Sequence, residues 1–216
     1  MGKLKMGILS GFTGAVGTVV GSTSKKGNDI IKARVRTRSA AASAEQLKQQ
    51  SKFGMTTGFM KGLNPVLKIG MKQRAVELKT HAFSYATQQA LMNAVSGSDD
   101  NPMLDYAKIS LSEGVISRLK VATATREGDV VNFAWGSQKG NSQSADTDKA
   151  MLVVYNVNQR ELSFSEGEYV RTDLAGTVDL PYTESGDTLL FYLFFQSAIN
   201  PLMVSSSQYL GSAIVE

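Results

Sequence analysis

Over residues 31–38, near the N-terminus, small or apolar residues alternate with cationic residues. A period of two places successive side chains on opposite faces of a strand. Before this segment, residues 18–23 read as a strand and are followed by the turn-forming sequence Lys25-Lys26-Gly27-Asn28. We therefore predict a β-hairpin with one basic face. The two alternating sets are Ile31, Ala33, Val35 and Thr37, and Lys32, Arg34, Arg36 and Arg38.

The pattern changes to helical spacing after a link of small residues. Ser43 followed by Gln46 fits a capping box, which predicts a helix that begins after Ser43. Gly62 and the following Asn64-Pro65 predict that this helix ends or kinks there. We expect two further helical segments, over about 65–74 and 83–95.

Methionines recur through the helical region. Methionine is flexible and commonly fills irregular gaps in a core, so we expect these side chains to be core residues. They are Met55, Met60, Met71, Met92 and Met103.

Short alternating segments separated by turn residues fill 104–216. This spacing predicts an antiparallel β-sandwich. Residues 188–196 are apolar on both faces, so this strand should be central, with the helices or another copy covering its second side. The expected strands cover 106–111, 116–124, 130–135, 150–156, 161–165, 176–180, 188–196 and 202–215.

These patterns predict an α+β fold with three regions. The first is a glycine-rich basic arm and hairpin over 1–40, and the second is a helical region over 41–103. The third is a β-sandwich of the immunoglobulin or fibronectin type over 104–216. The chain has 216 residues, 42% hydrophobic and 19% charged, which is ordinary for a folded protein.

The charge is divided unequally along the chain. Residues 1–85 hold 15 Lys and Arg against three Asp and Glu, a balance of +12. Residues 86–216 hold eight against 16, a balance of −8. Such a chain can attract a polyanion, an acidic partner, or the acidic half of another copy.

The sequence offers no catalytic or metal-binding constellation. It has no cysteine and a single histidine, which excludes disulfides, thiolate chemistry and sites built from several histidines. The acidic segments 99–105 and 146–148 lack the pattern of a calcium loop, and we interpret them as ordinary loops. We expect no cofactor, no metal and no enzymatic activity.

A basic stripe is the first candidate binding site. It could bind phosphates, contact a protein partner, or keep a solvated edge strand from aggregating. No aromatic residue lies between these cations, so stacking of single-stranded bases is not indicated. The stripe consists of Lys25, Lys26, Lys32, Arg34, Arg36 and Arg38.

The glycine-rich lead is the second candidate. Its spacing lacks the pattern of a nucleotide-binding loop, so we favour close packing of backbone over phosphate binding. The candidate packing arm consists of Gly7, Gly11, Phe12, Gly14, Gly17 and Gly21.

Two segments carry a resemblance that extends over nearly the whole chain. They are the opening MGKLKMGILSGFTGAVGTVVGS (1–22) and the stretch DKAMLVVYN (148–156). They resemble an uncharacterised family of unknown function from Bacteroidota and their phages. The resemblance implies a two-part protein that ends in an immunoglobulin- or fibronectin-like sandwich, and it transfers no site residue.

We expect a structural or assembly protein that self-associates or docks a protein partner, as a component of a phage particle or a surface array. The alternative is a nucleic-acid-associated protein that binds phosphates through the basic stripe. No segment has the length and hydrophobicity of a membrane span. The run over 6–24 is broken by glycines and lacks a clear cleavage site. This favours a cytoplasmic or particle-associated protein over a secreted one.

Overall fold

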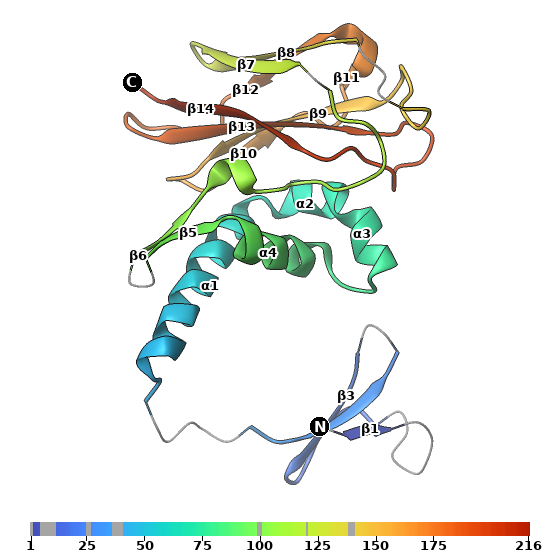
Figure 1. Ribbon diagram of the computed structural model, residues 1–216, viewed down its shortest axis with the longest axis vertical. Coiled ribbons are helices and arrows are strands. Elements are labelled where there is room, and N and C mark those ends of the chain that lie inside the picture. The colour runs from blue at the N-terminus through green and yellow to red at the C-terminus, as the bar shows by residue number, and fades with distance from the viewer. Residues whose placement is uncertain are drawn as a thin grey trace.

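The computed structural model shows an N-terminal sheet, a group of helices and a C-terminal pair of sheets (Figure 1). The N-terminal sheet lies apart from the rest, and the chain passes from it into the first helix (Figure 1). The structure describes residues 2–4, 12–24, 27–35, 41–98, 101–119, 121–137 and 141–216.

The N-terminal sheet has four short antiparallel strands in the order β1-β4-β3-β2. The predicted hairpin is present as β3 and β4, with one further strand on each side of it. The strands are β1 (Gly2–Leu4), β2 (Gly14–Val16), β3 (Val19–Thr23) and β4 (Asp29–Ala33).

The predicted helix start and stop signals are confirmed. The Ser43 hydroxyl accepts a hydrogen bond from Gln46 N at 3.4 Å, and Ser43 N donates to Gln46 Oε1 at 3.2 Å, which completes the capping box. The first helix ends at Gly62 as expected. The helices are α1 (Ala44–Gly62), α2 (Asn64–Gly70), α3 (Lys72–Glu77) and α4 (Ala82–Asn93).

The segment after α4 differs from the prediction. A small hairpin follows the helix, made of β5 (Val95–Ser98) and β6 (Asn101–Leu104). The strand expected over 106–111 is wrong, because Tyr106–Lys108 form a 3₁₀ turn. The Asp105 carboxylate accepts a hydrogen bond from Ala107 N at 3.2 Å, and this cap favours the turn over an extended strand.

Two antiparallel sheets form the C-terminal region, and most of their strands match the predicted segments. The three-stranded sheet has the order β12-β8-β7, and the larger sheet has the order β10-β9-β13-β14, with β11 also pairing with β9. The strands are β7 (Ala122–Glu127), β8 (Val130–Trp135), β9 (Lys149–Asn156), β10 (Glu161–Phe164), β11 (Tyr169–Val170), β12 (Ala175–Asp179), β13 (Thr188–Gln196) and β14 (Gln208–Ile214).

The larger sheet is the middle of three layers. On β13, Leu189 and Phe191 belong to a core shared with the three-stranded sheet. Leu190 and Tyr192 belong to a second core shared with the helices. The strand is therefore central and covered on its second side by the helices, which was one of the two covers expected. The predicted α+β class is confirmed.

A buried ion pair lies in the core between the two sheets. Arg171 Nη2 is 3.3 Å from Asp148 Oδ2, and the side chains are 1% and 0% exposed. The Arg171 guanidinium lies 4.1 Å from the centre of the Phe195 ring. Burial lowers the pKa of Arg171, and the Asp148 carboxylate opposes that shift. The sequence interpretation of 146–148 as an ordinary loop missed this role of Asp148.

A polar network fixes α3 and α4 to the loop that leads into the sheets. The Glu113 carboxylate accepts hydrogen bonds from Arg74 Nε at 3.0 Å and from the Tyr85 hydroxyl at 2.7 Å. Arg74 also pairs with Glu77 at 2.9 Å. Burial, followed by the bond to Glu113, raises the pKa of Tyr85. This network holds α4 in a defined position on the sheets.

Candidate functional site

The N-terminal sheet has two chemically different faces. In the register of β3 with β4, Ile31 lies opposite Gly21 and Ala33 lies opposite Val19. Lys32 lies opposite Val20, so these two residues share the other face. Since alternate residues point to opposite faces, the apolar set and the cation are separated as the sequence predicts. We call these the apolar face and the basic face.

The apolar face is largely open to solvent. Val16 pairs with Val19 across β2 and β3, and their side chains are 65% and 36% exposed. Val35, which follows β4, is 86% exposed. Phe12 covers the middle of this face, because a Cβ atom at Gly21 would collide with the Phe12 ring. Gly21 thus permits the close packing that the glycine pattern predicted, within this chain.

The remaining glycines of the predicted arm have other positions. Gly14 and Gly17 have positive φ values of 107° and 57°, and nothing lies within 4 Å of a Cβ atom at either position. Gly17 stands first in the two-residue turn between β2 and β3, where glycine is favoured. Gly7 and Gly11 lie outside the described residues.

The basic face is described at two of its six predicted cations. Lys32 and Arg34 are both exposed, and neither forms a salt bridge with another residue of the described part of the chain. Lys25, Lys26, Arg36 and Arg38 lie outside the described residues. The structure therefore places Lys32 and Arg34 in solvent, available to an anionic partner.

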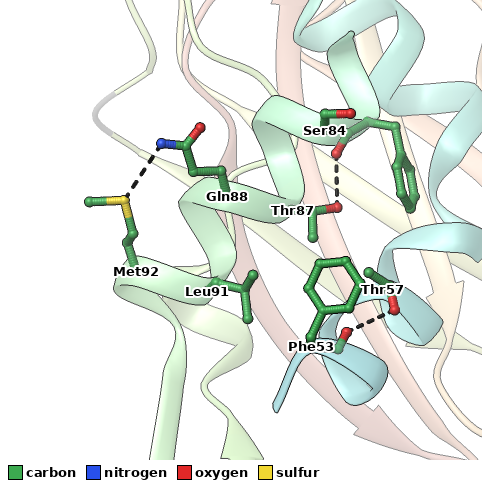
Figure 2. Close-up of a pocket in the computed structure, with 8 residues that line it drawn as sticks. Phe53, Thr57, Ser84, Thr87, Gln88, Leu91 and Met92 are labelled. Atoms are coloured by element: carbon green, nitrogen blue, oxygen red, sulfur yellow. Dashed lines mark hydrogen bonds between the residues drawn. The ribbon is translucent and has the colours of Figure 1, made fainter. Parts of the chain in front are cut away.

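A second apolar surface, which the sequence analysis missed, lies between α1 and α4. We call it the α1/α4 groove; its volume is about 370 Å³ (Figure 2). All of its lining residues are uncharged. They are Phe53, Thr57, Phe83, Ser84, Thr87, Gln88, Leu91 and Met92.

Hydroxyl groups in the groove walls form hydrogen bonds within their own helices. Thr57 Oγ1 donates to Phe53 O and Thr87 Oγ1 donates to Phe83 O, each at 2.8 Å (Figure 2). These hydroxyls therefore need no external partner to be satisfied. What remains exposed is apolar, with Phe53 at 55% and Met92 at 71% exposure.

The prediction that the methionines are core residues is correct for some and wrong for others. Met60 and Met71 are fully buried, whereas Met92 and Met103 are 71% and 59% exposed. Helical spacing alone could not separate them, because a stripe of apolar residues looks the same whether the fold covers it or leaves it open. The sequence of α4 has no charged residue, and this was the sequence feature that could have indicated the groove.

No metal centre emerges from the part of the chain that the structure describes. Within it, no three His, Asp or Glu side chains converge to hold a metal ion. Within the same residues, no helix combines the length and hydrophobicity needed to cross a bilayer. His81 is exposed at the start of α4 and its side chain forms no capping hydrogen bond there.

Comparisons with known proteins give a family and no function. No curated protein and no solved structure matches the chain. A family of unknown function, DUF6266, matches residues 11–211, which is most of the chain. The resemblance to a family of unknown function is thereby confirmed, and the chain belongs to the DUF6266 family.

Proposed function

We propose that the protein is a non-enzymatic assembly protein, and that its N-terminal sheet joins one copy to the next. The observation that carries this proposal is the exposed apolar face of that sheet. Val16 and Val35 are more than half exposed on it. Apolar surface is stabilised by about 25 cal/mol for each Å² removed from water, so a partner that covers this face gains free energy.

The size of the sheet supports the same proposal. Its strands have three to five residues each. Strands this short bury little apolar surface within the sheet, so a partner that covers the apolar face would stabilise it. Both hydrophobic cores of the body are built from residues at or after Phe59, among those that the structure describes. The sheet therefore lies outside both cores, and its apolar face is available to a partner.

The charge distribution supports a directional contact. The first 85 residues carry +12 and the rest carry −8. Opposite charges on the two ends steer copies into a head-to-tail arrangement. A contact between two different surfaces of the same chain builds rings when it closes and filaments when it does not. A phage particle or a surface array would use an assembly of this kind.

Sedimentation velocity of the untagged, full-length chain over a concentration series tests the proposal. We expect a multimer for the native sequence and a monomer for Val16→Asp, because the aspartate would have to be desolvated in the contact. The matched control is Ile199→Asp, which places the same charge at an 86% exposed residue of the body. The control should sediment like the native chain. A multimer that persists in Val16→Asp would contradict the proposal.

A second candidate function rests on the basic face. Lys32 and Arg34 are exposed there, on the opposite side from Val19 and Ile31. Cations at alternate strand positions can bind successive phosphates of a nucleic acid. The affinity for duplex DNA should then fall with salt, at a log–log slope of about −0.9 for each phosphate contact. A shallower slope in Lys32→Gln/Arg34→Gln supports this function, and an unchanged slope opposes it.

A further inference from the structure

The apolar face and the α1/α4 groove are two unpartnered surfaces of the same chain. The face exposes Val16 and Val35, and the groove exposes Phe53 and Met92. Both are apolar, and each chain contains one of each. We propose that the α1/α4 groove receives the apolar face of the N-terminal sheet from a second copy. This inference rests on the proposed self-association and names the surface that would accept the sheet.

The chemistry of the groove selects the apolar face over the basic face. None of the residues that line it carries a charge. A buried Lys32 or Arg34 would therefore lack an anionic partner there and would be desolvated at high cost. A sheet that docks through Val16, Val19 and Val35 leaves both cations pointing away from the groove. They then stay free to meet the acidic residues of a neighbouring sandwich.

The chain's own sheet does not occupy the groove in this structure, because it lies apart from the helices (Figure 1). The first half of α1 extends away from the sheets, and the N-terminal sheet is connected to that outer end (Figure 1). The buried residues of α1 are all in its second half, at Thr56, Phe59 and Met60. Leu47, in the first half, is 56% exposed. A docked copy would cover this half of the helix together with the groove.

The proposed contact is directional. Each copy would donate one sheet and accept one, so the contact joins two different surfaces. Docked in this way, every copy except those at open ends has both apolar surfaces covered. In a closed ring of such contacts, both apolar surfaces of every copy would be covered.

Engineered disulfides test the contact directly, because the chain has no cysteine of its own. Chains that carry Val16→Cys are mixed with isotope-labelled chains that carry Met92→Cys and are then oxidised. We expect a disulfide-linked pair of one labelled and one unlabelled chain. The matched control replaces Met92→Cys by Ile199→Cys, which is more exposed but lies outside the groove. The control should give several-fold less linked product.

Two results would overturn the inference. One is an equal yield of linked product from the mixture that contains Met92→Cys and from the mixture that contains Ile199→Cys. The other is a disulfide that forms only within a doubly substituted Val16→Cys/Met92→Cys chain, which would show that the groove takes the chain's own sheet.

The native mass of Met92→Asp separates this inference from the proposed function. Met92 is exposed, so the substitution should leave the body folded, as circular dichroism would show. We expect Met92→Asp to be monomeric. If Met92→Asp remains a multimer that Val16→Asp breaks, self-association is supported and the groove is the wrong receptor. If the native chain is itself a monomer, both the proposed function and this inference fail.

Discussion

Gly62 of α1 lies against the ring of Tyr155 of β9, so closely that a Cβ atom on Gly62 would be 2.5 Å from the tyrosine hydroxyl oxygen. The same hydroxyl donates a hydrogen bond to Phe59 O at 3.2 Å. Burial raises the pKa of Tyr155 to about 12. This contact fixes the inner end of α1 on the larger sheet and so sets the position of the α1/α4 groove.

Gly62→Ala should therefore destabilise the protein. The added methyl group would displace Tyr155 from a packed core, which typically costs about 1–3 kcal/mol of unfolding free energy. Gly54→Ala on the same helix is the matched control, because nothing lies within 4 Å of a Cβ atom there. Alanine is the better helix former, so the control should gain up to about 1 kcal/mol. Denaturant unfolding measures both, and equal effects would contradict the packing.

The buried ion pair gives a second prediction about stability. Asp148→Ala would leave Arg171 charged and unpaired between the sheets, which should cost about 3–5 kcal/mol. The control is Lys48→Met, which removes the exposed pair of Lys48 with Glu45 on α1. That pair should contribute less than about 0.5 kcal/mol. A loss below about 1 kcal/mol for Asp148→Ala would show that Arg171 finds another partner.

The pH dependence of stability follows from Asp187. Its carboxylate accepts hydrogen bonds from Asn156 Nδ2 at 2.8 Å and Glu184 N at 2.9 Å, and these bonds lower its pKa. The folded state thus prefers the ionised form. The resulting stability is present above the unfolded pKa of about 4 and is lost as the pH falls through the folded value.

We expect the unfolding free energy to decline as the pH falls below about 5. Asp187→Asn cannot titrate at this position, so its decline should be shallower. Chemical denaturation at a series of pH values measures both slopes. Identical slopes for the two proteins would show that Asp187 is not coupled to folding.

The cap of α1 gives a local prediction. Ser43→Ala removes the hydroxyl that accepts from Gln46 N, and loss of such a cap costs about 1 kcal/mol of helix stability. Hydrogen exchange of the first turns of α1 should become faster. Ser51→Ala, at an exposed position within the same helix, should leave that exchange unchanged or slower, because alanine is the better helix former. Equal exchange rates in the two variants would mean that the capping box does not stabilise this end.

Local signals were enough to predict much of this fold. Residues 130–135 and 188–196 are strands with the predicted bounds, since alternation and flanking turn residues determine a strand locally. Ser43 and Gly62 marked the ends of α1 because caps act within a few residues. The covered second face of β13 was also predictable, since its residues are apolar on both sides.

Features that depend on distant contacts could not be predicted. The strand expected over 116–124 starts only at Ala122, and Ile116 forms an isolated bridge with Ser205 instead. The exposure of Met92 depends on how α1 and α4 approach each other. The pairing of Asp148 with Arg171 joins residues 23 positions apart, and no local pattern announces it.

The native mass of the untagged, nuclease-treated, full-length chain, measured by light scattering after size exclusion in moderate salt, tests the central claim most directly. The account predicts a discrete multimer, because a second copy would cover the exposed apolar face of the N-terminal sheet. The mass of a single chain, unchanged across the concentration range, would contradict it.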